Sequence, residues 1–224
     1  MKNNVMIRQE TRELMRGKWL KGAMIALIYM AVAALITYVT SGNPDESDPS
    51  KWLLSLATQL LASIVILYPL QVGFAMVWLK LARTGSGPEL KPLLGGFTRR
   101  YHKSAMGTLL LMQIYTVLWT LLLIVPGIIK SIEYAMTPFI MVEHPHLSAT
   151  EAIQASRDMM DGHKWELFVL SLTFIGWEIL GALTCGIGLL WVTPYKNAAY
   201  AAFYRSFQET IPPRDTPKAA EEES

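Results

Sequence analysis

The sequence holds a single cysteine, Cys185, among its 224 residues. One thiol excludes a disulfide within the chain and every metal cluster that needs several cysteine ligands. The chain also carries little charge for its length, with 20 basic and 18 acidic residues and a formal net charge of +2. Because it has neither a basic run nor a strong positive balance, we expect no nucleic-acid partner.

Signatures of catalysis are missing as well. The sequence has no G-x-S-x-G elbow, no H-E-x-x-H pair, no P-loop and no carboxylates paired for acid–base work. His144, His146 and His163 fall in one polar region, but a zinc site needs further ligands at suitable spacing. We therefore expect a protein that is not an enzyme, with no catalytic residue, no cofactor and no metal site.

Apolar residues are abundant, at 52% of the chain, and they gather in long runs with few charges. A helix needs about 20 apolar residues to cross the roughly 30 Å hydrocarbon core of a bilayer. The runs near that length are residues 20–40, 53–82, 105–125, 128–143, 165–183 and 187–206. The sequence therefore predicts an all-α, polytopic membrane protein whose six transmembrane helices form three hairpins, the first span being uncleaved.

The charge distribution predicts how these spans are oriented. The N-terminal segment and residues 80–103 are rich in lysine and arginine, whereas the loop 41–51 carries three acidic residues. Basic loops stay in the cytoplasm, and an even number of spans places both termini on one side. We expect a multi-pass protein of the bacterial plasma membrane with cytoplasmic termini, residues 1–208 being one transmembrane domain and 209–224 a disordered tail.

A short motif recurs before the first and the third hairpin. Residues 12–19 read RELMRGKW and residues 157–165 read RDMMDGHKW, each ending in Lys-Trp after a glycine. Glycine commonly ends a helix, and tryptophan favours the membrane interface. A short amphipathic surface helix is therefore predicted at 5–17, at 84–104 and at 148–162.

The same pattern suggests an internal repeat of three units in parallel orientation, 5–82, 88–143 and 148–207. The alternative is that any cytoplasmic lead-in to a membrane helix favours arginine, glycine and tryptophan. In the third unit, Ser148 and Glu151 have the spacing of a capping box.

Of the charged side chains in the predicted spans, Lys130, Glu133, Glu178 and Lys196 are the candidates for function, because a charge costs at least about 2.5–3.5 kcal/mol at the bilayer centre. Glu178 and Lys196 lie at similar depth on adjacent helices, given a rise of about 1.5 Å per residue. Either these two pair and tie their helices together, or they line a polar cavity that opens outward. The lining of such a cavity would be Lys130, Glu133, Glu178, Lys196, Asn197, Gln113 and Tyr195.

Basic residues of the surface helices form the other candidate site. Each lysine or arginine near an anionic surface contributes about 1 kcal/mol to binding. The candidate contacts to anionic lipid headgroups are Arg8, Arg12, Arg99, Arg100 and Lys103. The expected partner is the cytoplasmic face of the bilayer. The small residues after Asn197 would suit close helix packing, a homo-oligomer or a membrane-protein partner.

The last third of the chain resembles a known family. The strings LSLTFIGW at 170–177, LTCGIGLLWVTPY at 183–195 and AAFYRSF at 201–207 are similar to the bacterial integral-membrane family catalogued as domain of unknown function 975. RELMRGKWLKGAMIALIY at 12–29 resembles the opening of that family. The resemblance implies a multi-span membrane fold and carries over no catalytic residue. Glu178 departs from the family pattern, which has an apolar residue there.

The sequence also has a distant similarity to the membrane domains of some bacterial glycerophosphodiesterases, which implies a role on the lipid side. The leading hypothesis is a non-enzymatic protein with a membrane-organising, envelope or stress role. The alternative is a small transporter with a polar cavity near Glu178 and Lys196. A third reading is an accessory subunit of a membrane complex, whose tail recruits a partner.

Overall fold

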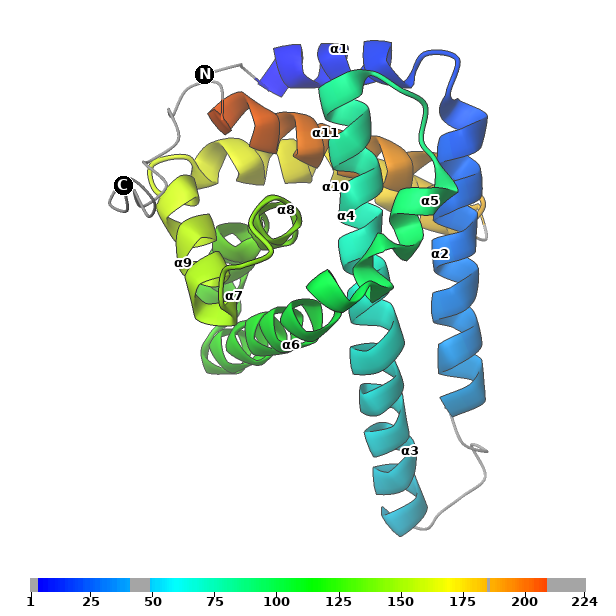
Figure 1. Cartoon of the computed structure of the whole chain (residues 1–224), viewed down its shortest axis with the longest axis vertical. Helices are drawn as coiled ribbons and strands as arrows, with labels where there is room; N and C mark the ends of the chain where they lie inside the picture. The colour runs from blue at the N-terminus through cyan, green and yellow to red at the C-terminus, as the bar shows by residue number, and fades with distance from the viewer. Residues whose placement is uncertain (1–3, 41–48, 185, 209–224) are drawn as a thin grey trace, which may run out of the picture.

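The computed structural model describes residues 4–40, 49–184 and 186–208, and every regular element in these ranges is a helix (Figure 1). The predicted tail 209–224 and most of the acidic loop lie outside the described residues. The helices in the first half of the chain are α1 (Asn4–Met15), α2 (Trp19–Thr40), α3 (Pro49–Ala62), η1 (Ser63–Leu67), α4 (Tyr68–Thr84), α5 (Leu90–Leu93) and η2 (Leu94–Phe97). Those in the second half are α6 (Arg99–Leu122), α7 (Ile124–Tyr134), α8 (Thr137–Glu143), α9 (Ala149–Met160), α10 (Lys164–Leu183) and α11 (Leu189–Gln208).

Helix α2 and the continuous rod α3–η1–α4 form a long hairpin (Figure 1). The α3 half of the rod protrudes from the rest of the molecule, and its apolar side chains are exposed. Leu53, Leu54, Leu60 and Leu61 are each more than half accessible. An exposed apolar surface of this extent in a helix of this length is what a lipid environment accommodates.

The rod carries a π-helical turn at Ser63–Leu67, where the backbone N–H of Tyr68 donates to the carbonyl of Ser63. Pro69 follows in the first turn of α4. A proline inside an α-helix removes a donor and clashes with the carbonyl four residues earlier. The wider π turn therefore lies at the place where Pro69 predicts a disturbance of the helix.

The core is built around α4 and α11. Helix α11 packs on both α2 and α4 and runs across them (Figure 1). Its buried face carries Ala198, Ala199, Ala201 and Ala202, which let the helices approach closely. On the other side of α4, a Cβ added at Gly73 would lie 1.8 Å from the carbonyl oxygen of Leu93. The α5–η2 segment therefore packs backbone against backbone on α4.

Three described helices are long and apolar enough to cross a membrane, Trp19–Thr40, Leu53–Thr84 and Lys164–Leu183, and this marks the chain as a membrane protein. The prediction of six spans was wrong. The described apolar part of α6, Met106–Leu122, is shorter than the three candidate spans and is not among them. The predicted fourth span divides at residues 135–136 into α7 and α8.

The predicted sixth span corresponds to α11, which is helical through Pro194 rather than broken there. Its polar residues, including Lys196, Asn197 and Arg205, lower its hydropathy, so that it is not among the candidate spans. Nearly its whole second half is buried within the protein. An apolar run in the sequence does not distinguish a helix buried in protein from one that faces lipid, and this caused the error.

Both copies of the recurring motif adopt the same local structure. A short helix ends just before Gly17, with φ of 73°, or Gly162, with φ of 78°, and a long helix starts two residues later at Trp19 or Lys164. The left-handed conformation suits glycine because a Cβ would be strained there. The predicted capping box is confirmed, with Ser148 and Glu151 exchanging both hydrogen bonds at the start of α9.

Candidate functional site

A hollow of about 330 Å³ lies between α1 and the neighbouring α10 and α11. We call it the α1 hollow; its lining residues are Val5, Arg8, Gln9, Arg12, Thr173, Phe174, Trp177 and Tyr195. Helix α1 lies along α10, since the Asn4 side chain donates to the carbonyl of Glu166 at 2.8 Å. Further along α1, Tyr195 of α11 donates its hydroxyl to the carbonyl of Arg8 at 3.2 Å.

The two arginines of the α1 hollow were predicted as lipid contacts, and the structure places them together on its α1 side. Within the described part of the chain, neither guanidinium has a carboxylate within ion-pair distance. The Nε of Arg8 is buried and has no hydrogen-bond partner among the described residues. A buried donor without a partner carries a free-energy cost that an anionic ligand would remove.

The opposite wall of the α1 hollow is aromatic. The ring of Tyr195 packs between Trp19, at 5.7 Å between centroids, and Phe174, at 5.3 Å. Trp177 lies one turn after Phe174 and is 59% exposed. The hollow thus joins two cations that have no carboxylate partner in the described ranges to an apolar, aromatic surface on the exposed flank of α10.

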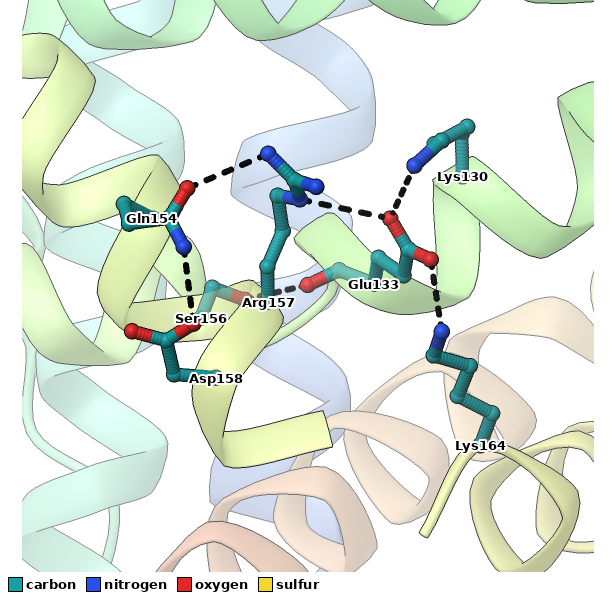
Figure 2. A network of polar contacts seen from close by, with 7 residues as sticks. All are labelled: Lys130, Glu133, Gln154, Ser156, Arg157, Asp158 and Lys164. Carbon is teal, nitrogen blue, oxygen red and sulfur yellow. Dashed lines mark hydrogen bonds and ion pairs between the residues drawn. The ribbon is translucent and has the colours of Figure 1, made fainter. Parts of the chain in front are cut away.

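A second polar centre surrounds Glu133 of α7 (Figure 2). The side chain of Glu133 is only 6% exposed. Lys130 donates to its Oε2 at 2.6 Å and Lys164 to its Oε1 at 2.7 Å, while Arg157 Nε lies 3.6 Å from Oε2. Ser156 donates to the main-chain carbonyl of Glu133 at 2.6 Å. We call these residues the Glu133 cluster; it joins α7, α9 and α10 through one carboxylate.

The charges around Glu133 determine the protonation state of its carboxyl group. Burial raises the pKa of the Glu133 carboxyl, but the hydrogen bonds and charges of Lys130 and Lys164 outweigh it and hold the pKa below its usual value. Glu133 therefore stays ionised at neutral pH. The Lys164 contact also contradicts the predicted six-span topology, in which the span 128–143 starts at the outer face and the span 165–183 starts at the cytoplasmic face.

A third centre surrounds Glu143 at the end of α8. Its carboxylate accepts hydrogen bonds from Tyr204 at 2.8 Å and from Gln208, and it pairs with Arg83 at the end of α4. The contacts tie the ends of α4, α8 and α11 together. No sequence pattern described above predicted this centre; the available signal was that each of these polar residues lies at the end of an apolar helix.

Glu178 and Lys196 form the ion pair that was one of the two predicted alternatives. Lys196 Nζ donates to Glu178 Oε1 at 2.7 Å, and the two side chains are 29% and 36% exposed. Lys196 also lies over the ring of Tyr200, 5.8 Å from its centroid. The pair connects α10 with α11, which are consecutive antiparallel helices joined by a short turn.

The polar cavity predicted from the sequence is divided in the structure. Gln113 and Asn197 line a second hollow of about 330 Å³ together with Gln71, while Tyr195 lines the α1 hollow. Lys130, Glu133, Glu178 and Lys196 line neither of these two hollows. Asn197 donates its amide to the carbonyl of Thr193 at 2.8 Å and so bonds within its own helix.

Arg99, Arg100 and Lys103 lie in the first turns of α6, and their side chains are outside the described residues. Over the described ranges, no group of three histidine, cysteine, aspartate or glutamate side chains is placed to hold a metal ion. His144 and His146 stack edge to face, 5.8 Å between ring centroids.

A comparison with protein families supports the resemblance seen in the sequence. The family model described as "Protein of unknown function (DUF975)" matches residues 1–132 and 121–210. The chain belongs to this family. A comparison with curated proteins and a comparison with solved structures each found no match to the chain. The DUF975 match covers α1 and α10 alike, and thus both walls of the α1 hollow.

Proposed function

We propose that this DUF975 protein is a non-enzymatic protein of the bacterial plasma membrane that binds anionic lipid headgroups at the cytoplasmic face. The observation that carries the proposal is the pair Arg8 and Arg12, which lack a carboxylate partner in the described part of the chain and lie beside Trp177. Unpaired arginines next to an aromatic ring match the chemistry of a bilayer interface. A membrane-organising or envelope role would use such contacts.

The orientation follows from the hairpin of α2 and α3–η1–α4. Its two basic ends lie together, because Lys18, just before α2, donates to the carbonyl of Gly85, just after α4. The connection at the far end is the acidic segment 41–51. The positive-inside rule then places the α1 end of the hairpin, and with it the N-terminus, in the cytoplasm.

Helix α10 lies along the cytoplasmic leaflet in this proposal, although its composition would allow a span. The charged residues of α1, such as Arg8 and Arg12, belong at the surface, because each would cost several kcal/mol inside the bilayer. Asn4 of α1 donates to the carbonyl of Glu166, and Arg8 of α1 lines the same hollow as Trp177, so this stretch of α10 stays close to α1. Helix α10 also crosses the hairpin rather than running beside it (Figure 1).

The permease alternative has less support. It needs Glu178 and Lys196 to face a water-filled path, but the two side chains pair with each other. They also line neither hollow. The pair therefore supports a role in holding α10 against α11. The accessory-subunit alternative depends on the tail 209–224, and deleting these residues without a phenotype would argue against it.

The proposed function is tested by the lipids that co-purify with the protein in a mild nonionic detergent. We expect anionic phospholipid to be enriched over the bulk membrane composition. Replacing all five basic candidates, Arg8, Arg12, Arg99, Arg100 and Lys103, with glutamine should abolish the enrichment. A wild-type protein whose bound lipid has the composition of the whole membrane would contradict the proposal.

The proposed position of α10 is tested by labelling with a membrane-impermeant maleimide. In a Cys185→Ser background, Ile187→Cys places the only thiol just after α10, on a residue that is 63% exposed. We expect labelling in inverted vesicles and none in spheroplasts. Asp45→Cys in the same background reports the outer face and should give the reverse. Labelling of Ile187→Cys in spheroplasts would show instead that α10 crosses the bilayer.

A further inference from the structure

We propose that the α1 hollow is a binding site for the headgroup of one anionic phospholipid molecule, a specific site within the general surface binding proposed above, on which this inference rests. Its volume of about 330 Å³ lies at the lower end of the roughly 300–1,000 Å³ found for small-molecule sites. That space holds a phosphate group with its glycerol, and it leaves the acyl chains outside.

The phosphate contacts come from α1. Arg8 and Arg12 are four residues apart, so both guanidinium groups lie on one face of the helix. Arginine binds phosphate through parallel N–H donors, and these charge-assisted bonds are stronger than neutral ones. The Nε of Arg8 is a buried donor without a hydrogen-bond partner in the described residues. A phosphate oxygen in the hollow would satisfy it.

The rest of the α1 hollow suits the glycerol, from which the acyl chains leave the hollow. Phe174 and Tyr195 form a wall that is already fixed by ring packing, so the site needs little rearrangement to bind. Gln9 of α1 adds an amide at the rim. Trp177 and, one turn further, Leu180 are both more than half exposed on α10, so an acyl chain leaving the hollow has an apolar surface to follow.

This arrangement distinguishes a phospholipid from a free anion. A free phosphate would use the arginines alone, whereas a lipid uses the arginines and the aromatic flank together. Loss of Trp177 should therefore weaken lipid binding and leave any binding of inorganic phosphate unchanged. The Glu133 cluster has basic residues too, but its carboxylate already occupies them.

The test is titration of the full-length, delipidated protein in nonionic detergent, with bound lipid counted by native mass spectrometry. The probes are phosphatidylglycerol, phosphatidylcholine and inorganic phosphate. We expect one high-affinity phosphatidylglycerol per protein and at least tenfold weaker binding of the other two. The double variant Arg8→Gln, Arg12→Gln should weaken phosphatidylglycerol binding about tenfold or more.

Matched variants separate this site from general surface charge. Arg16→Gln, Lys21→Gln removes the same charge from the same end of the molecule, at exposed residues that do not line the hollow. It should change the affinity less than twofold. Trp177→Ala should weaken phosphatidylglycerol binding severalfold, whereas Trp165→Ala, on the same helix and 71% exposed, should not. Arg8→Lys, Arg12→Lys keeps the charge and should give an intermediate loss.

The outcomes separate this inference from the proposed function. If both charge-removing double variants lose binding equally, the specific site is wrong while general anionic binding stands. If inorganic phosphate competes as well as the lipid, the hollow is a free-anion site and the lipid assignment is overturned. If phosphatidylglycerol and phosphatidylcholine bind alike, both proposals fail. Unchanged circular dichroism of each variant shows that a lost affinity is not a lost fold.

Discussion

Helices α1 and α9, which lead into the two copies of the recurring glycine turn, differ in the partners of their arginines. In the first copy, α1 leads through Gly17 into α2, and Arg8 and Arg12 face a hollow without a carboxylate in the described residues. In the second copy, α9 leads through Gly162 into α10, and Arg157 lies against Glu133 and Gln154. The same local signal thus precedes one helix whose arginine pairs with a buried carboxylate and one whose arginines have no carboxylate partner in the described residues.

The Glu133 cluster supplies the larger structural effect. Glu133→Gln leaves Lys130, Arg157 and Lys164 without their shared anion, and removing one partner of a buried ion pair costs about 3–5 kcal/mol. Because Arg157 and Lys164 are partly exposed, we expect a loss near the lower end, about 3 kcal/mol, measured by denaturation in detergent. Asp158→Asn on the exposed face of α9 is the control. Equal losses in the two variants would show that the cluster does not support the second lead-in.

The shared turn should show equal effects in the two copies. Gly17→Ala and Gly162→Ala each place a Cβ in open space, so the cost comes only from the left-handed backbone, about 1–2 kcal/mol. Thermal unfolding in detergent measures both. Gly176→Ala, also in open space but inside α10, should be neutral or stabilising. A loss in only one copy would mean that the likeness of the two turns does not extend to their energetics.

The arginines themselves should differ in a smaller but informative way. Arg157→Gln removes a partly exposed ion pair and should cost about 0.5–1 kcal/mol. Arg8→Gln removes no ion pair and should change the unfolding free energy by less than about 0.5 kcal/mol. For anionic lipid binding the order should be reversed, with Arg8→Gln losing more affinity than Arg157→Gln. Equal stability losses would remove the distinction between the two lead-ins.

The response to acid is a further test of the Glu133 cluster. The pKa of Glu133 is lower in the folded protein than its ordinary value of 4.5, because Lys130 and Lys164 outweigh burial. Its contribution to stability is therefore complete above that value and is lost as the pH falls through the folded pKa. Unfolding curves between pH 6 and pH 3 should show a steeper loss for the wild type than for Glu133→Gln. Parallel curves would contradict this.

The parts of the fold that local signals determine were predictable. Gly17, the capping box at Ser148 and the apolar run 53–82 each depend on neighbouring residues, and the structure has the expected helices there. Whether residues 187–206 face protein or lipid depends on residues far away in the sequence. Their small side chains allow the helix to pack against α2 and α4, and it is therefore buried in protein. Hydropathy along the chain does not contain that information.

The candidate site divides in the same way. Arg8 and Arg12 were predictable from their charge and from their place on an amphipathic helix. Trp177 and Phe174 were not, because they lie more than 150 residues away in what the sequence presents as an ordinary apolar run. The contact between Lys164 and Glu133 was not predicted, because the six-span topology placed the two residues near opposite faces of the membrane, whereas the structure brings them to within hydrogen-bond distance.

The π turn at Ser63–Leu67 divides the long rod into two segments with different constraints. One extra residue in a turn rotates everything on one side by about 100° relative to an unbroken α-helix. The side chains of α4 are fixed by what they pack on, including Trp78 and Leu81 in the core, whereas α3 has none of its described residues buried. The π turn therefore separates the two helices. The side chains of α4 keep the positions that their packing requires, whereas the only requirement that the described contacts place on α3 is an apolar surface.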